Sequence, residues 1–115
     1  MREIYRPRGK SLDDFTPIGP WIVTKDEFKN PPALPIRSYV NGELRQDSNT
    51  ELMINGIEKV ICELTQGMTL QAGTIIAMGT PAGVGMGFQP PRFLKRGDVV
   101  TCEIEGIGTM TNKIK

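Results

Sequence analysis

The fold depends most on the stretch LPIRSYVNGELRQ, residues 34–46. An Asn41-Gly42 pair lies at its centre, and the strand-forming residues around this pair are Ile36, Tyr39, Val40 and Leu44. Asn-Gly is a strong signal for a two-residue hairpin turn, because both central residues of a type I′ turn need a positive φ, which Asn and Gly tolerate. The stretch therefore predicts an antiparallel β-hairpin.

A second hairpin is predicted over FLKRGDVVTCEIEGIGTMTNKI, residues 93–114. An Arg-Gly-Asp turn at 96–98 precedes an apolar run at 99–104, which has the composition of a strand. A Glu-Gly turn at 105–106 then leads into a last strand that runs to the end of the stretch.

Two more apolar runs, at residues 21–24 and 75–78, are predicted to be strands, and an Ala-Gly turn at 72–73 precedes the second. The 13 glycines and 9 prolines favour turns and short strands over long helices. We therefore expect a mainly β fold with one principal helix, in a single domain over residues 1–115.

The principal helix is predicted over SNTELMINGIEKVICELTQG, residues 48–67. Ser48 and Glu51 fit a capping box, and Gly67 is a typical C-terminal stop. Gly56 is a weak point inside the helix, where glycine costs about 1 kcal/mol relative to alanine. An apolar stripe recurs at helical spacing, made of Met53, Ile57, Val60, Ile61 and Leu64. We expect this stripe to pack on the sheet; a groove for a partner is the alternative.

Composition excludes several classes of protein. The net charge is +1, which gives no electrostatic basis for binding nucleic acid or membranes. No apolar run is long enough to span a bilayer, and the first residues lack the apolar core of a signal peptide. We expect a cytoplasmic protein in which Cys62 and Cys102 are buried, reduced thiols.

The chain contains no histidine, which excludes a Ser-His-Asp triad, a Cys-His dyad or a histidine-bound zinc built from this chain alone. The two cysteines match no zinc-binding spacing. Chemistry at this chain would therefore use carboxylates, lysine, hydroxyls, backbone groups or a hard metal ion.

The glycine-rich stretch IIAMGTPAGVGMGFQPP, residues 75–91, is not a phosphate-binding loop, since no lysine follows its glycines at the required place. It is not a dinucleotide-binding turn either, because Phe88 replaces the third glycine and prolines block a helix start. A flexible surface loop and the wall of a small-molecule site both remain open. In the second case Gly79 and Thr80, directly after the predicted strand, are placed to bind a carboxylate or keto oxygen.

Four ordered blocks carry a family resemblance, and they are KSLDDFTPIGPWIVT, VNGELRQDSNTELMINGI, GTPAGVGMG and FLKRGDVVTCEIEGIGTMTN. Together they resemble the fumarylacetoacetate hydrolase family, in particular its domain-containing subgroup with bacterial relatives that act on 2-oxo acids of aromatic degradation. The resemblance implies part of a mixed β-roll, a dimer, and a magnesium or manganese ion that chelates a 2-oxo acid. The family's reactions are C–C bond hydrolysis, decarboxylation and keto–enol isomerisation, in which a Lewis acid stabilises the enolate.

The resemblance assigns three site residues. Lys10 in GKS matches a catalytic lysine of the metal and substrate pocket, and a solvated surface lysine is the alternative. Thr80 in GTP matches a threonine that hydrogen-bonds the substrate beside the Gly79 amide, and simple turn chemistry is the alternative. The glycines after Thr80 would let the backbone approach the ligand closely.

The metal ligands of the family, a Glu-x-Glu pair and an Asp, all precede the GKS block and have no counterpart in this chain. Glu3 is the only acid before Lys10, and Glu103 and Glu105 have the right spacing but are expected on a solvated strand face. The chain also has Asp14 and Thr74 where the family usually has Thr and Asp, respectively. We therefore expect no tight magnesium binding by this chain alone.

The chain thus resembles the C-terminal part of a family member that lacks its N-terminal metal-ligand segment. We expect a metal-dependent hydrolase or lyase acting on acylpyruvate-like 2-oxo acids, inactive as this fragment alone. A homodimer or association with a missing N-terminal half would complete it. The alternative is a non-catalytic remnant that serves as a binding or assembly module.

Overall fold

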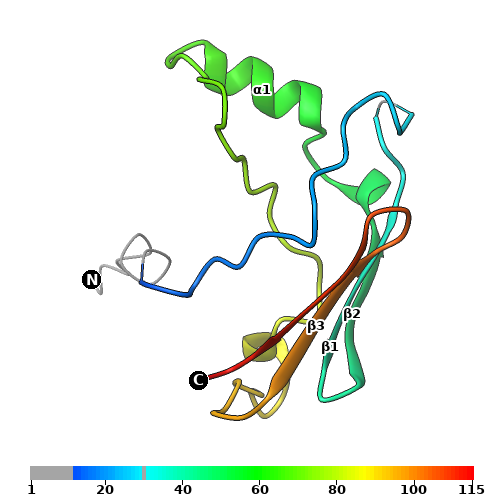
Figure 1. The fold of residues 1–115 in the computed structure, drawn as a ribbon, viewed down its shortest axis with the longest axis vertical. Coiled ribbons are helices and arrows are strands. Elements are labelled where there is room, and N and C mark those ends of the chain that lie inside the picture. The colour runs from blue at the N-terminus through cyan, green and yellow to red at the C-terminus, as the bar shows by residue number, and fades with distance from the viewer. Residues whose placement is uncertain (1–11, 30) are drawn as a thin grey trace.

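Two antiparallel hairpins form the sheet of this protein in a computed structural model, which describes residues 12–29 and 31–115. The first hairpin is β1 (Pro35–Val40) with β2 (Glu43–Asn49), and the second is β3 (Val99–Ile104) with β4 (Gly108–Lys113). The four strands have the order β2-β1-β3-β4, so that β1 pairs with both β2 and β3 (Figure 1). Both predicted hairpins are confirmed, as is the mainly β class.

The Asn41-Gly42 turn joins the two hairpins as well as β1 and β2. Asn41 and Gly42 have φ values of 52° and 83°, the left-handed conformation that the sequence predicts. The Asn41 amide N–H donates to the Val99 carbonyl at 2.8 Å, and the Val99 N–H donates to Asn41 Oδ1 at 2.9 Å. Asn41 Nδ2 also donates to Asp98 Oδ1 at 2.9 Å. One turn residue therefore sets where β3 begins against β1.

A β-bulge interrupts the first hairpin. Ser38 pairs with Gln46, but the next residue of β1, Tyr39, pairs with Leu44. Arg45 is therefore an extra residue without a partner in β1, and such a bulge changes the direction of the side chains beside it.

The helix begins later than predicted. Residues 50–52 form a short 3-10 turn, η2 (Thr50–Leu52), and the only α-helix in the described part of the chain is α1 (Ile57–Thr65). The predicted capping box is wrong, because Ser48 lies in β2, where it pairs with Ile36. Asn49 instead caps η2 by accepting from the Glu51 N–H at 3.0 Å. Gly56 has extended backbone and stands at the N-cap of α1, not inside the helix.

The apolar stripe of the helix does not pack across the sheet, which corrects that expectation. Figure 1 shows α1 beyond the end of β1 and β2, away from the sheet faces. Ile57, Val60 and Leu64 are half-buried, while Ile61 is 41% exposed. The stripe is amphipathic as predicted, but the described residues cover it only in part.

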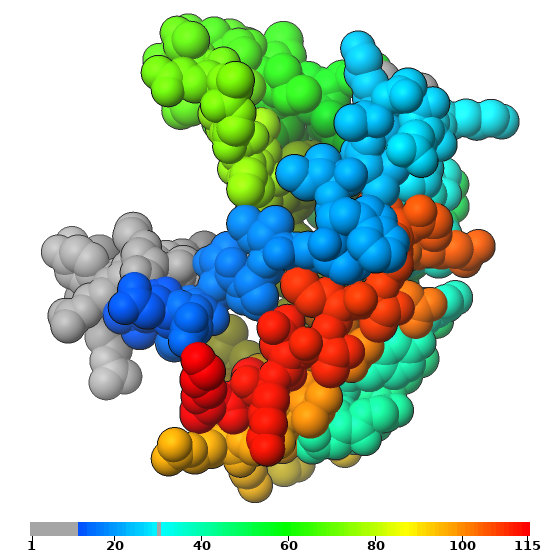
Figure 2. Space-filling model, in the orientation of Figure 1, coloured from blue at the N-terminus to red at the C-terminus, as the bar shows by residue number. Residues whose placement is uncertain are grey.

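The runs at 21–24 and 75–78 are not strands in this structure. The predicted turn at 72–73 does form, and the Thr74 N–H donates to the Gln71 carbonyl across it at 3.1 Å. The first run lies against the β3–β4 hairpin, where a Cβ on Gly108 would come within 3.1 Å of the Trp21 ring (Figure 2). Each run is apolar enough for a strand, but neither finds a strand to pair with among the described residues.

Apolar surface remains uncovered over the described residues, none of which is fully buried. Ile54 is 98% exposed and Ile22 is 87% exposed. The accessible surface is 9943 Å², whereas a compact monomer of this length would have about 6,200 Å². Much of the area that would form a core in a compact domain therefore faces outward.

The two cysteines are free, as expected, but both are exposed and not buried. The two thiols are exposed for the same reason as the apolar side chains above, because the faces that carry them are not covered by the described residues. In the described part of the chain, no helix has the length and apolar character needed to cross a membrane.

Replacing Gly42 by valine tests the turn. A β-branched residue at a φ of 83° is strained, and we expect the free energy of unfolding to fall by about 2 kcal/mol in urea titrations. Gly67→Val is the matched control, because Gly67 lacks a positive φ and has open space around it, so its change should stay below about 0.5 kcal/mol. Equal losses in the two variants would contradict the role of the turn.

Asp98 should titrate in a way that depends on Asn41. The hydrogen bond from Asn41, and then the one from the Lys95 backbone N–H, lower the pKa of Asp98 below its ordinary 3.8. Because the pKa is lower in the folded state, the carboxylate stabilises the fold above its ordinary pKa, and this contribution is lost as the pH falls through the folded value. Asn41→Gly keeps the left-handed turn but removes the donor, so an NMR titration should show the pKa of Asp98 rising toward 3.8. An unchanged pKa would show that the bond is not formed in solution.

Candidate functional site

Thr80 and Gly79 lie at the rim of a concavity of about 760 Å³, here called the helix-side concavity. Its walls come from Ile36 of β1, from Ile57 and Val60 of α1, and from residues 77–82. It is therefore formed where the end of the sheet, the apolar stripe of α1 and the start of the glycine-rich stretch meet. The two residues predicted to bind substrate that can be placed thus border one hollow.

A glutamine holds the Thr80 hydroxyl. Gln46 Nε2 donates to Thr80 Oγ1 at 2.8 Å and to the Pro81 carbonyl at 2.9 Å. The Ser38 hydroxyl donates to Gln46 Oε1 at 2.8 Å, so both ends of the Gln46 amide are bonded. Gln46 was not predicted as a site residue, and its spacing in a strand carries no signal that would have identified it.

One glycine of the glycine-rich stretch approaches β2 closely, and a second approaches the segment that follows the stretch. A Cβ on Gly83 would overlap the carbonyl oxygen of Arg45, and a Cβ on Gly85 would overlap that of Arg92. The Arg92 N–H donates to the Gly85 carbonyl at 2.8 Å, beside the short turn η3 (Gly85–Gly87). These glycines serve a close approach between backbone segments, whereas Gly79 has a φ of 104° and open space where a Cβ would be.

Two arginines clamp the same stretch. The guanidinium groups of Arg45 and Arg92 lie 5.2 Å and 4.9 Å from the centre of the Phe88 ring, within cation–π range. Glu43 pairs with both arginines, at 3.3 Å to Arg45 Nη2 and 2.8 Å to Arg92 Nη1. Phe88 is therefore held against β2 by two guanidinium groups that share one carboxylate.

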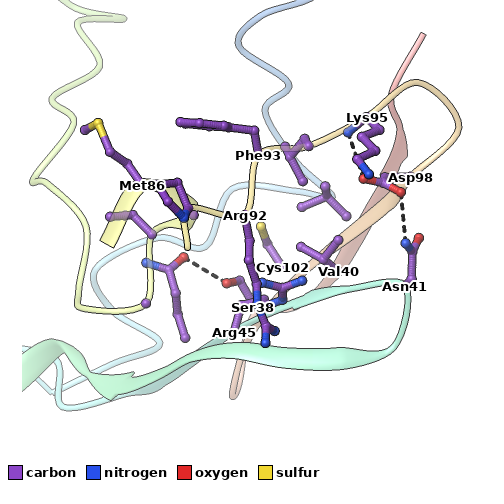
Figure 3. A pocket seen from close by; sticks show the side chains of 17 residues that line it. Ser38, Val40, Asn41, Arg45, Met86, Arg92, Phe93, Lys95, Asp98 and Cys102 are labelled. Carbon is purple, nitrogen blue, oxygen red and sulfur yellow. Dashed lines mark hydrogen bonds between the residues drawn. The ribbon is translucent and has the colours of Figure 1, made fainter. Parts of the chain in front are cut away.

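The bulge explains how two consecutive residues reach this stretch. In a regular strand Arg45 and Gln46 would point to opposite faces. Because Arg45 is the extra residue, both side chains line the same hollow of about 950 Å³, here called the sheet-side concavity. Figure 3 shows it from close by, with Arg92 reaching toward the sheet from the loop and Val40 lying on the sheet.

The sheet-side concavity belongs to the packing of the glycine-rich stretch against the sheet more than to a ligand site. Most of its charged groups are engaged, since Arg45 Nη2 and Arg92 pair with Glu43, while Arg45 Nε is buried without a partner among the described residues. Asp98 is bonded to Asn41 and to the Lys95 N–H (Figure 3). The other side chains around it are mostly apolar and belong to the uncovered surface. The helix-side concavity, with its oriented hydroxyl, is therefore the better candidate for binding a small polar ligand.

The structure does not position the predicted lysine or the nearby acidic residues in the helix-side concavity. Lys10 and Glu3 lie outside the residues that the structure describes. Asp14 forms an ion pair with Lys115 Nζ at 2.7 Å, a contact that lowers the pKa of the carboxyl. Asp13 is exposed.

The Glu-x-Glu pair, with Glu103 in β3 and Glu105 in the turn after it, forms no metal site with the other described residues. Glu103 lies 3.7 Å from Arg37 Nη1 and accepts from the Tyr39 hydroxyl at 3.4 Å, while Glu105 lies exposed in the turn after β3. Over residues 12–29 and 31–115, no three acidic or thiol side chains gather where they would bind a metal ion. The described residues therefore do not fit a divalent cation by themselves.

Comparison with known proteins connects this geometry to a family. Residues 2–115 match the family described as Fumarylacetoacetate (FAA) hydrolase C-terminal. The oxaloacetate tautomerase YisK of Bacillus subtilis is 50% identical over 106 residues, which are 92% of this chain and 35% of that protein. The chain thus spans about a third of the length of the curated relatives it matches.

Solved structures agree with the fold. A fumarylacetoacetate hydrolase from psychrophilic Exiguobacterium antarcticum superposes with a TM-score of 0.90 at 52% identity, over 94% of this chain and 39% of that one. Maleylpyruvate hydrolase from Sphingobium sp. SYK-6, in complex with manganese (II) ion and pyruvate, gives a TM-score of 0.77 at 39% identity, over 87% of this chain and 35% of that one.

Gly83→Ala should release the docked stretch. The new methyl group would overlap the Arg45 carbonyl at a φ of 103°, and we expect a loss of about 2–3 kcal/mol of stability and faster hydrogen exchange at the Arg92 amide. Gly87→Ala is the control in the same stretch, since its Cβ would meet only Val84 at 3.8 Å. Unchanged exchange at Arg92 in Gly83→Ala would contradict the docking.

Proposed function

Because this chain belongs to the fumarylacetoacetate hydrolase family, we propose that it forms the carboxy-terminal part of a metal-dependent enzyme acting on small 2-oxo acids. The reaction that we favour is keto–enol isomerisation of an oxaloacetate-like acid, since a relative named oxaloacetate tautomerase is 50% identical to the chain. C–C bond hydrolysis of an acylpyruvate is the second reaction of the same class, in line with the maleylpyruvate hydrolase of similar structure. A non-catalytic binding or assembly module is the alternative function.

The observation that carries the proposal is the Thr80 hydroxyl, held by Gln46 at the rim of the helix-side concavity. A hydroxyl fixed in place can donate to a substrate carboxylate or to the 2-oxo oxygen. When a proton leaves the carbon next to the carbonyl, negative charge develops on that oxygen, and a preorganised donor stabilises it more than water would. Gly79 would contribute its backbone amide to the same ligand.

Lys10 is proposed to supply a positive charge beside the substrate, as the family resemblance implies. An ammonium group near the developing enolate would lower the energy of that charge in the same way as the hydroxyl.

A divalent cation is proposed for the complete protein only. The similar maleylpyruvate hydrolase was crystallised with manganese (II) ion and pyruvate, which supports magnesium or manganese as the ion. The described residues of this chain do not form a cage for it, so its ligands would come from elsewhere in the protein. No step of the chemistry proposed here depends on where that ion lies.

The uncovered apolar surface supports assembly with further protein. Half-buried Ile57 and Val60 of α1, and fully exposed Ile54 nearby, would be covered by the remainder of a family member or by a second chain. Covering them would deepen the helix-side concavity and exclude water from it. A homodimer and a partner that carries the amino-terminal segment both remain consistent with this surface.

Activity should be tested in a chimera that joins the amino-terminal portion of the Bacillus subtilis tautomerase to this chain in place of its matching segment. The decay of enol oxaloacetate is followed by ultraviolet absorbance. We expect Thr80→Val and Lys10→Met each to lower kcat/KM by about 100-fold, the usual loss of one donor to a developing oxyanion. Thr69→Val, an exposed threonine after α1, is the matched control and should retain full activity.

Two outcomes would count against the proposal. A folded chimera without activity toward oxaloacetate or an acylpyruvate would favour the non-catalytic module. An active chimera in which Thr80→Val retains full turnover would remove Thr80 from the site and leave the glycine-rich stretch as a structural loop.

A further inference from the structure

We propose that Gln46 is a positioning residue that fixes the direction of the Thr80 hydrogen bond, so that the hydroxyl proton is available only to the ligand. The proposal rests on the proposed function, because it concerns the ligand that Thr80 binds. It makes Gln46 part of the selectivity of the site although Gln46 lies outside the helix-side concavity.

The orientation of the Gln46 amide follows from its partners. The atom that lies 2.9 Å from the Pro81 carbonyl must be the NH₂ group, because a carbonyl oxygen can only accept. The opposite end of the amide is then Oε1, which accepts from the Ser38 hydroxyl at 2.8 Å. The Pro81 carbonyl therefore excludes the flipped amide, which would place Gln46 Oε1 against the Pro81 carbonyl oxygen, whereas the Ser38 hydroxyl could bond to either end of the amide.

The orientation of the amide determines what Thr80 can do. Nε2 only donates, so Thr80 Oγ1 accepts in the 2.8 Å bond between them. The hydroxyl has a single proton, which this bond does not use. Over the described ranges 12–29 and 31–115, no residue accepts that proton, and Thr80 borders the helix-side concavity. The proton is therefore free for a ligand oxygen.

This polarity defines the class of ligand at that position. A carboxylate or a 2-oxo oxygen accepts the proton, whereas an amide NH₂ or an ammonium group in the same place cannot accept it and leaves the hydroxyl proton without a partner. A site built in this way discriminates between an acid and its amide of equal size, since the mismatched ligand leaves a polar group unpaired.

Gln46 acts from behind the site. It lines the sheet-side concavity, while Thr80 and Pro81 line the helix-side concavity, so the Gln46 amide lies on the boundary between the two hollows. The β-bulge at Arg45 gives this placement, because it turns two consecutive side chains toward the same stretch of chain. Gln46 therefore acts on the ligand through the residues that it holds, Thr80 above all, and not by direct contact.

The first test is a double-mutant cycle in the chimera described above, with Gln46→Met as an uncharged side chain of similar length. We expect Gln46→Met to lower kcat/KM by about 10-fold when Thr80 is present, since Thr80 then loses its fixed direction. In the Thr80→Val background the same change should alter kcat/KM by less than about two-fold, because residues that act as one unit are not additive. An equal loss in both backgrounds would overturn the proposal and leave Gln46 a merely structural residue.

The second test is a pH profile of Gln46→Glu. Above the pKa of the new carboxyl group, the carboxylate accepts from Thr80 and takes the proton that the ligand needs. Below that pKa, the protonated acid has one proton to donate, where the amide has two, and donation to Thr80 leaves the hydroxyl proton to the ligand again. We expect kcat/KM to rise as the pH falls through this pKa, relative to the wild-type chimera. Gln71→Glu, the same change in an exposed position before the turn at 72–73, should keep the wild-type profile.

The two proposals fail in different ways. If Thr80→Val retains full activity, the proposed function of Thr80 is wrong and this inference falls with it. If Thr80→Val loses activity but Gln46→Glu keeps the wild-type pH profile, the role of Thr80 stands and that of Gln46 does not. Urea titrations of each variant ensure that a loss of folding is not mistaken for either result.

Discussion

Three hydrogen bonds of Asn41 hold this structure together. They run from a single left-handed turn residue to Asp98 and Val99, which lie 57 and 58 residues further along the chain. Through them the first hairpin is placed in register beside the second, and β1 becomes an inner strand with partners on both sides. Every residue of β1 is half-buried as a result, although the described residues contain no fully buried core.

The candidate site is a consequence of that register. Once β1 is fixed, the bulge at Arg45 aims two neighbouring side chains of β2 at the glycine-rich stretch. Arg45 holds the stretch through Phe88, and Gln46 holds it through Thr80 and Pro81. The position of one hydroxyl at the rim of the helix-side concavity thus depends on a strand irregularity rather than on the loop that carries it.

The sequence predicted those parts of the structure whose cause is local. The turn at Asn41-Gly42 and the second hairpin could be recognised because their turn residues require unusual backbone conformations wherever they occur. The start of the helix was placed too early, since Ser48 and Glu51 match a capping box, but pairing of Ser48 with Ile36 takes precedence over that local preference. The runs at 21–24 and 75–78 have strand composition without a strand partner.

The candidate site was predicted only in part, for the same reason. Gly79 and Thr80 were proposed from their place after an apolar run and from the family resemblance, and both border one concavity. Gly83 is needed because the backbone of Arg45 lies against it, and Gln46 matters because it bonds to Thr80. Each partner is more than 30 residues away in the chain. No spacing within the sequence indicates such contacts. The uncovered apolar faces also have a consequence in the cell, because chaperones and proteases act on exposed apolar segments. We expect the abundance of this chain to follow the supply of whatever covers these faces, so that surplus copies are degraded and stoichiometry is set after synthesis.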